Sequence, residues 1–227
     1  MQRGKINMVT AEITFSREQL LGLNHPIEWV GVNWQTYEDI SEELGESTSF
    51  HLTYNKGVLT IMPVTELHET LIILLERFIT LVSLVTQKNI IPTGKATLRS
   101  KRRDYGVEPD LSYFVSKSDI HQLKNYVPKE LELAPDIVGE IDIHHPSDDK
   151  FEIYAEFGVS EFWQYNGERF KIFKLQSNSE YAEIERSEEI PILTSAVLTE
   201  FLKRGQTEQQ FTVLSDFQNW LNAETRA

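Results

Sequence analysis

Hydrophobic and polar positions along the chain alternate with two different periods. Residues 49–54 place Phe50, Leu52 and Tyr54 on one face, and residues 58–62 alternate again after the turn signal Asn55-Lys56-Gly57. This pattern predicts a β-hairpin that Pro63 ends. Residues 160–165 and 169–175, joined by Asn166-Gly167, predict a second hairpin.

A helical period follows the first hairpin. Thr65 could cap a long helix whose apolar side chains, from Leu71 to Val85, recur at helical spacing over about five turns. Further helices are expected over residues 34–44, 151–157, 195–203 and 208–221, and strands over residues 9–15, 90–98, 106–115, 137–143 and 181–185, with a loop over 128–135.

The order of these elements predicts a mixed sheet with helices packed on its faces. This is an α/β or α+β core, and no linker divides it, so we expect one domain over residues 1–227. Residues 1–16 are expected to form a tail, and residues 195–222 to form C-terminal helices.

The composition is that of a soluble globular protein with a core, because 40% of the residues are apolar and 25% are charged. There is no cysteine, which excludes disulfides and thiolate metal sites and fits a cytoplasmic location. No signal peptide is expected. Glu69, Glu76 and Arg77 interrupt the most apolar stretch, so a buried helix explains it better than a membrane span.

The net charge of −13 counts against a broad, non-specific grip on nucleic acid, since phosphate binding rests largely on basic surface. Part of the negative charge could instead belong to a metal site. One basic cluster runs against the average; it comprises Lys95, Arg99, Lys101, Arg102 and Arg103.

The candidate catalytic and metal-binding residues lie on two predicted strands. Glu108, Asp110 and Ser112 share one face of the first by period-2 alternation, and Glu140 and Asp142 share one face of the second. A carboxylate within so apolar a run is costly unless it is paired or binds a cation. If the strands are neighbours, the carboxylates converge, repel one another and are relieved by a hard divalent cation.

Lys150 stands at the start of the helix that follows and could point back over the strand end. There it could orient a water or stabilise charge on a scissile phosphate. Tyr154 lies four residues on, on the same helix face. As the first residue of a helix, Lys150 is also expected to be largely exposed.

Plain structural interpretations stand beside these. Pro-Asp pairs are common in turns, and Lys150 alone is typical of a surface lysine. Asp148, Asp149 and Glu152 suit a helix start, where acids complement the dipole. His144-His145 invites a metal interpretation, but adjacent histidines in an extended chain point to opposite faces, and a loop pair is favoured. No Gly-rich phosphate loop and no metalloprotease or hydrolase motif is present.

The succession of motifs resembles the Uma2 family of putative restriction endonucleases, over about residues 34–175. Four stretches carry the resemblance: the hairpin Leu52–Pro63 followed by His68-Glu69, Glu108–Tyr113 with its Pro-Asp, Ile137–Ile141 with its Glu, and Lys150–Trp163 with its Lys-x-x-x-Tyr, Gly-Val and Glu-Phe-Trp. The last stretch is the most specific.

The resemblance implies a restriction-endonuclease-like, PD-(D/E)XK core and roles for the matching residues. Asp110 and Glu140 would bind Mg²⁺ or Mn²⁺, and Lys150 would be the catalytic lysine. Glu69, Asp142 and Tyr154 would be accessory residues. The family usually has a small Ser-Pro segment after its Glu, whereas residues 142–147 here read Asp-Ile-His-His-Pro-Ser.

The expected function is therefore a metal-dependent endonuclease that hydrolyses phosphodiester bonds in DNA. The alternative is a catalytically weak or inactive relative that uses the fold for binding or assembly. A hydrolase of small phosphorylated molecules would suit the charge but has no phosphate loop behind it. The Asp110 and Glu140 carboxylates are expected within about 6 Å of each other, close enough to share a cation.

A homodimer with two-fold symmetry is expected, since such pairs are the commonest assembly and two sites suit two DNA strands. The C-terminal helices offer apolar surface for the contact, although the same side chains could equally cover the protein's own core.

Overall fold

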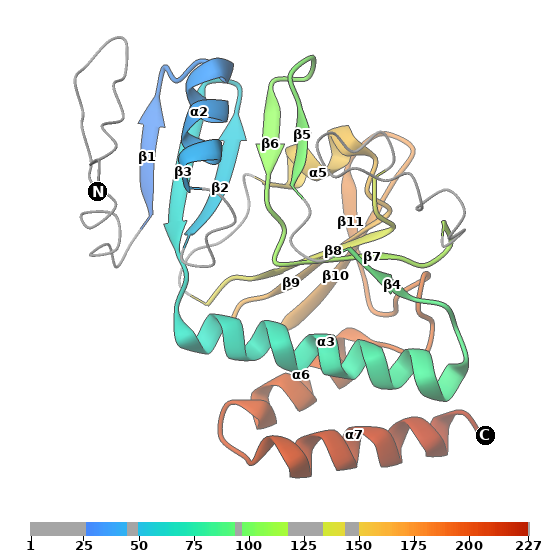
Figure 1. Ribbon diagram of the computed structural model, residues 1–227. Helices are drawn as coiled ribbons and strands as arrows, with labels where there is room; N and C mark the ends of the chain where they lie inside the picture. The colour runs from blue at the N-terminus through green and yellow to red at the C-terminus, as the bar shows by residue number, and fades with distance from the viewer. Residues whose placement is uncertain (1–25, 45–49, 94–96, 118–133, 144–149, 227) are drawn as a thin grey trace. The chain divides into compact units, whose positions relative to one another are not determined.

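The computed structural model describes residues 26–44, 50–93, 97–117, 134–143 and 150–226. The chain divides into two compact units (Figure 1). Unit 1 comprises residues 1–65 and 99–108, and unit 2 comprises residues 66–98 and 109–227. The expected tail and the strand over residues 9–15 lie outside the described residues, as do His144, His145, Asp148 and Asp149. The expectation of one domain stays a prediction.

Unit 1 is built on a five-stranded sheet of order β1-β3-β2-β6-β5. Its central hairpin forms as expected, with Asn55 opposite Val58. Helix α2 packs on this sheet through Tyr37, whose ring stacks on Tyr54 at 4.9 Å between centroids. The elements are β1 (Ile27–Val30), α2 (Trp34–Leu44), β2 (Phe50–Asn55), β3 (Val58–Pro63), β5 (Leu98–Ser100) and β6 (Tyr105–Val107).

Unit 2 is built on a six-stranded sheet of order β11-β10-β9-β8-β7-β4. Strand β8 lies within it, antiparallel to β7 and parallel to β9. The strands are β4 (Ile91–Pro92), β7 (Leu111–Phe114), β8 (Ile137–Ile141), β9 (Glu161–Tyr165), β10 (Phe170–Leu175) and β11 (Tyr181–Ile184).

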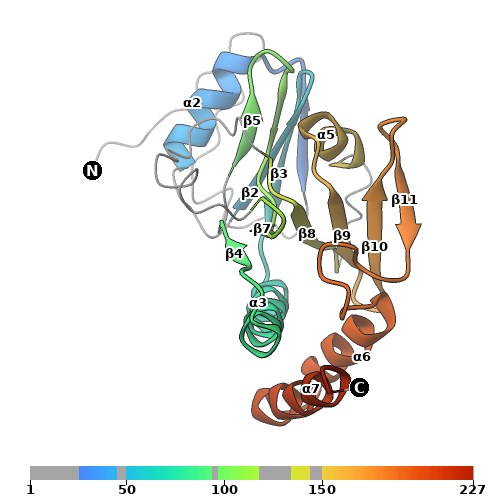
Figure 2. The same ribbon diagram turned by 90° about the vertical axis from the view of Figure 1, so that its right-hand side faces the viewer.

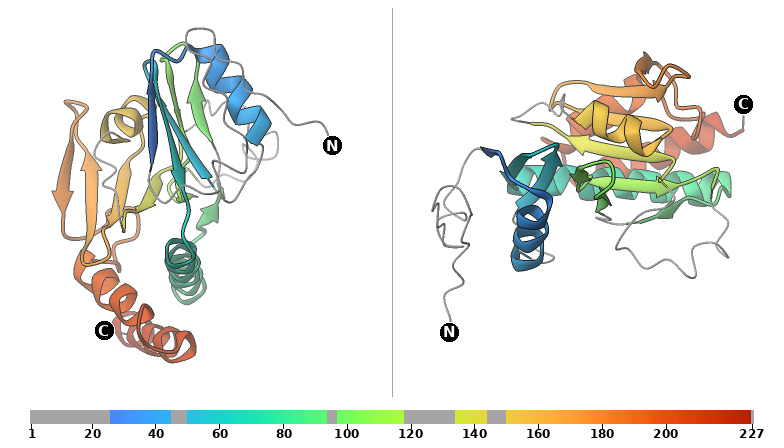
Figure 3. Two further views of the ribbon diagram at one scale, coloured as in Figure 1. Left: turned by 90° about the vertical axis from the view of Figure 1, so that its left-hand side faces the viewer. Right: turned by 90° about the horizontal axis from the view of Figure 1, so that it is seen from above.

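Helices cover both faces of this sheet (Figure 2). On one face, α3 (Glu66–Thr86), α6 (Ser195–Gly205) and α7 (Gln210–Glu224) share a core with Ile137 and Ile141 of β8. On the other face lies α5 (Lys150–Phe157) (Figure 3). Its Phe151 packs edge-on against Phe162, with 4.7 Å between the ring centroids. Alternate residues of β8 therefore meet different helices, and Glu140 shares the α5 face.

The structure confirms the fold class, a mixed α and β architecture with helices on the sheet faces. The two hairpins and the expected helices form close to their predicted bounds, as does the strand over residues 181–185. Strand β1 was not expected; it is a four-residue edge strand paired only to β3 within the described residues, and its alternation is too short to stand out.

Two expected strands are wrong. The expected strand 106–115 is two strands, β6 in one sheet and β7 in the other, separated at Glu108-Pro109-Asp110. Proline has no N–H for a sheet ladder and restricts the residue before it, so the pairing stops there. The expected strand 90–98 is likewise replaced by β4 and β5, which belong to different sheets.

Candidate functional site

Glu140 is the centre of the candidate site, and its position follows from the pattern of β8. The apolar residues of this strand fill the core on the α3 face, which leaves Glu140 on the opposite face. Its neighbours in register are Gln164 on β9 and, by continuing the β7 pairing of Leu111 with Gly139, Asp110. Glu140 is only 2% exposed, so its charge needs partners inside the protein.

Helix α5 supplies two of those partners. The Lys150 ammonium donates to Glu140 Oε2 at 2.7 Å, and the Tyr154 hydroxyl donates to Glu140 Oε1. Their spacing of four residues puts both side chains on one helix face. The sequence pattern had indicated this face, and the structure turns it toward the strand that carries Glu140.

The expectation that Lys150 is largely exposed is wrong, because the residue is only 2% exposed. Helix α5 packs on the sheet through the aromatic cluster of Phe151, Phe162 and Phe173. This packing carries the first turn of the helix onto the sheet. A buried ammonium requires a counter-charge, which Glu140 provides.

Asp110 lies in the break between β6 and β7 and is 4% exposed. Its Oδ2 accepts a hydrogen bond from the Ile141 N–H at 2.7 Å. The carboxylate thus binds the backbone directly beside Glu140. It replaces the backbone carbonyl that a continuous strand would have offered to the Ile141 N–H. The two acids are brought to one place, as the sequence suggested, although Asp110 belongs to a loop and not to a strand.

Burial and charge shift the ionisation of this group. Burial raises the pKa of the Glu140 carboxyl above its ordinary value; the Lys150 ammonium lowers it, while Asp110 and Asp142 raise it further. Burial lowers the pKa of Lys150, but the three carboxyl groups outweigh it and the net direction is upward. Burial and the neighbouring Glu140 raise the pKa of Tyr154. Lys150 therefore stays cationic and Tyr154 stays neutral, while Glu140 is the group poised to exchange a proton.

His68 is a member of the site that sequence reasoning did not assign. It lies in the first turn of α3, and its Nε2 is 2.9 Å from Asp110 Oδ2. Its side chain is 16% exposed. The sequence offers a signal, the His68-Glu69 pair at the helix start, but the family resemblance implies the accessory role for the acid. Glu69 is half-buried in the same turn, and its role stays a prediction.

Asp142 extends the polar row on the α5 face. Its Oδ2 accepts a hydrogen bond from Gln164 Nε2 at 2.7 Å, and both residues are 8% exposed. Gln164 is a second residue that the sequence pattern did not single out, because a lone glutamine in an aromatic strand carries no spacing signal. It was the register of β8 with β9 that placed it beside Glu140.

Carboxylates of this kind fit a hard divalent cation. Mg²⁺ is commonly held by one or two protein carboxylates, with waters and substrate phosphates completing the shell. Asp110 and Glu140 supply two such groups, and the effect of Asp110 on the pKa of Glu140 is the repulsion that a cation would relieve. Within the described ranges, no three His, Asp or Glu side chains are grouped as a self-sufficient metal cage.

The fold and this cluster of buried carboxylates and lysine define a mixed α and β protein with a compact polar centre in its second unit. Comparison with known proteins gives the family. The Uma2 family, described as "Putative restriction endonuclease", matches residues 34–202. The chain belongs to the Uma2 family.

A solved structure gives the same fold. It is the crystal structure of a "putative nuclease belonging to DUF820" from Anabaena variabilis ATCC 29413, with a TM-score of 0.50 and 16% sequence identity. The match covers 72% of this chain and 97% of that one. A search of the curated proteins found no match. None of the helices in the described ranges has the length and apolarity needed to cross a bilayer.

Proposed function

We propose that the protein is a metal-dependent endonuclease that hydrolyses phosphodiester bonds, with DNA as its substrate. Membership of the Uma2 family supports the nuclease class. The single observation that carries the proposal is the buried 2.7 Å ion pair between Lys150 and Glu140, set beside the Asp110 carboxylate. A purely structural ion pair would not require a second buried acid next to it.

In this proposal Asp110 and Glu140 hold Mg²⁺ or Mn²⁺. When bound, such a cation neutralises charge on the phosphate and lowers the pKa of a water nucleophile. Lys150 is cationic within hydrogen-bonding distance of Glu140, so it can hold the attacking water or meet charge that develops on the phosphate. Tyr154 keeps Glu140 in place from its other oxygen.

His68 acts as a positioning residue in the same proposal. Its ring nitrogen fixes the Asp110 oxygen that also accepts the Ile141 N–H. These two contacts to Oδ2 fix the orientation of the Asp110 carboxyl group. They therefore also fix where its other oxygen, Oδ1, points. Hydrogen-bonded partners of this kind commonly tune the affinity of a metal ligand.

The test is single-turnover cleavage of DNA with Mn²⁺ by the wild type, Asp110→Asn and Glu140→Gln, with Lys203→Ala as a control because Lys203 is exposed in unit 2. We expect the two site variants to lose at least about 100-fold in rate and the control to keep the wild-type rate. Equal rates for all four proteins would remove this cluster from the reaction.

A second candidate function is a binding or assembly module that has lost catalysis. One observation favours it: both oxygens of Glu140 already accept hydrogen bonds, from Lys150 and Tyr154. A cation would have to compete with these partners. The absence of cleavage by the wild type across many DNA substrates, together with retained DNA binding, would select this alternative.

A further inference from the structure

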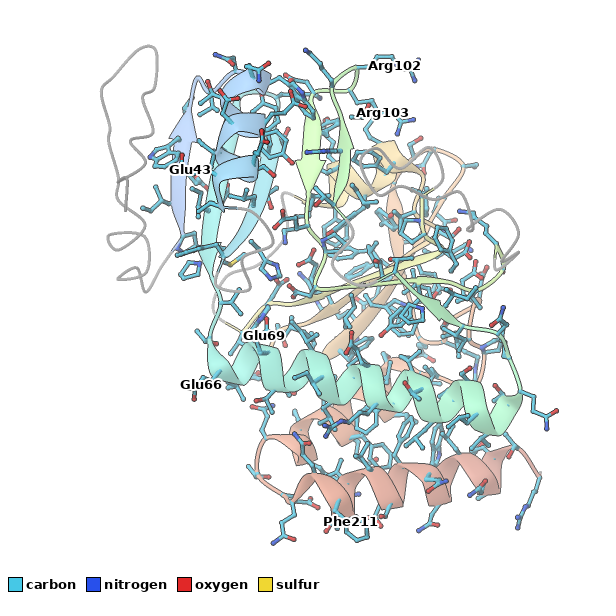
Figure 4. All side chains as sticks on the ribbon, viewed as in Figure 1. Glu43, Glu66, Glu69, Arg102, Arg103 and Phe211 are labelled. Carbon is cyan, nitrogen blue, oxygen red and sulfur yellow. The ribbon has the colours of Figure 1, made fainter. Side chains whose placement is uncertain are left out.

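Two neighbouring turns of unit 1 present basic side chains. One is the β2–β3 turn with Lys56, and the other joins β5 to β6 with Lys101, Arg102 and Arg103. The Lys56 N–H donates to the Asp104 carbonyl at 3.0 Å, so the two turns lie side by side. We name this surface the basic turns. Figure 4 shows Arg102 and Arg103 at the turn end of the β5–β6 hairpin.

The charge distribution of unit 1 singles this surface out. Across the described part of unit 1, every Lys and Arg belongs to the basic turns or to the adjoining Arg99 on β5. Helix α2 of the same unit carries only acids among its charged residues: Glu38, Asp39, Glu42 and Glu43. Since the whole chain has a net charge of −13, this grouping of basic side chains is a local departure from the average charge.

The backbone of the basic turns is held in shape. Lys56 has φ 44° and Asp104 has φ 60°, and both values lie in the left-handed region that residues other than glycine seldom adopt. The Asp104 N–H donates to the Lys101 carbonyl at 3.3 Å, which closes the second turn. The Lys56 ammonium lies 4.9 Å from the centroid of the Tyr105 ring. A preformed turn loses less conformational entropy when it binds a partner.

The surroundings favour a polyanion over a protein partner. Lys56, Lys101 and Arg102 are exposed. Val30 is the sole large apolar side chain exposed in the described part of unit 1, whereas stable protein interfaces centre on an apolar core. Phosphate groups need cationic side chains and no apolar surface.

We infer that the basic turns bind the phosphodiester backbone of duplex DNA. This inference rests on the proposed function, and it answers the difficulty that the acidic composition raises for a nuclease. The contact is with phosphates and not with base edges, so it holds the substrate without selecting a sequence.

The experiment measures binding of a short fluorescein-labelled DNA duplex by anisotropy, with the full chain in EDTA so that the DNA stays intact. The variant is Lys101→Ser with Arg102→Ser, both exposed turn residues. The control is Lys203→Ser with Arg226→Ser, which removes the same charge from exposed positions in unit 2. Affinity is recorded over a series of salt concentrations, and thermal melts check that both variants fold.

We expect the turn variant to bind DNA more weakly than the control. The slope of log Kd against log salt concentration should fall by about 1.8, since each of the two lost phosphate contacts removes about 0.9. With a single-stranded probe the change should be smaller, at about 0.7 for each contact. Equal losses in the turn and control variants would overturn the inference, as would a wild type that does not bind the duplex.

Failure of this inference and failure of the proposed function are separable. If the wild type cleaves DNA with Mn²⁺ and the turn variant binds DNA like the control, the proposed nuclease activity is supported and the role of the basic turns is overturned. If the wild type binds DNA through the basic turns but cleaves no DNA, this inference is supported and the protein is better described as a binding module.

Discussion

Lys150 and Glu140 form a buried ion pair, with 2.7 Å between the lysine Nζ and the glutamate Oε2 and only 3% and 2% of their side chains exposed. The pair joins the first residue of α5 to the last residue but one of β8. Breaking one partner of such a pair leaves a buried charge uncompensated, which is more costly than removing both charges. Lys150 therefore contributes to stability as well as to the proposed chemistry.

The first prediction concerns the variant Lys150→Ala. We expect its DNA cleavage rate in Mn²⁺ to fall by about 100- to 1,000-fold, because one preorganised charge is lost from the reaction site. We also expect its free energy of unfolding to fall by about 3–5 kcal/mol, because Glu140 stays buried without its counter-charge. Single-turnover kinetics and urea unfolding measure the two effects.

A double variant separates the two roles of the lysine. Lys150→Met with Glu140→Gln removes both charges and keeps the side-chain volume, so it should recover most of the lost stability and remain inactive. Lys203→Ala, on an exposed lysine, serves as the control. A Lys150→Ala protein as stable and as active as this control would contradict the prediction.

The second prediction concerns His68, whose Nε2 lies 2.9 Å from Asp110 Oδ2. We expect His68→Ala to weaken Mn²⁺ binding by about 10- to 100-fold, because Asp110 loses a group that orients it. Glutamine at this position can donate a similar hydrogen bond and should restore part of the affinity. Isothermal titration with Mn²⁺ gives the constants, and it requires no cleavage.

Glu69→Gln is the matched comparison for His68→Ala, since the two residues are adjacent in the first turn of α3. If the histidine positions Asp110, the glutamine variant keeps more of the Mn²⁺ affinity. A larger loss from Glu69→Gln would return the accessory role to the acid, as the family resemblance implied.

The third prediction concerns the separation of Asp110 and Glu140. Crystals soaked in Mn²⁺ should show an anomalous peak between their carboxylates, which we expect within about 6 Å of each other. Asp110→Asn should remove the peak. An ion bound elsewhere, or carboxylates separated by more than about twice that distance, would end the metal-site argument.

Much of the fold could be predicted because local pattern and tertiary structure agree there. Both hairpins carry an Asn-led turn between alternating strands, and α3 has a long helical period. The predictions fail where the tertiary structure departs from what the local sequence pattern favours. Asp110 gives its carboxylate to the Ile141 N–H in place of strand pairing, and no periodicity encodes that exchange. Local pattern predicted exposure for Lys150, whereas burial follows from how α5 packs on the sheet.

The fourth prediction is that the protein forms a two-fold dimer. The C-terminal helices use Val213, Phe217 and Leu221 to fill the core of unit 2, so these side chains are not available for the contact. Phe211, at the start of α7, is 81% exposed and offers apolar surface. We expect light scattering at micromolar concentration to give a dimer mass and Phe211→Glu to lower it. A wild-type monomer would refute the prediction.

The fifth prediction is that Mn²⁺ binding strengthens as pH rises and releases a proton. Burial and the charges of Asp110 and Asp142 raise the pKa of Glu140 above its ordinary value, against the lowering effect of Lys150. Below that raised pKa the carboxyl carries a proton, which a cation must displace before Glu140 can act as its ligand. The apparent affinity should therefore increase with pH and level off once Glu140 is ionised.

Isothermal titration in two buffers of different ionisation enthalpy counts the protons released. Glu140→Gln should weaken Mn²⁺ binding because it removes one proposed ligand, and the binding that remains should release no proton from this position, since the amide carries no acid proton. His68→Gln should retain it, which distinguishes the glutamate from the nearby imidazole as the source. Mn²⁺ binding that does not change across the pH range in which Glu140 titrates would contradict the prediction. Proton release that survives in Glu140→Gln would assign the proton to another group.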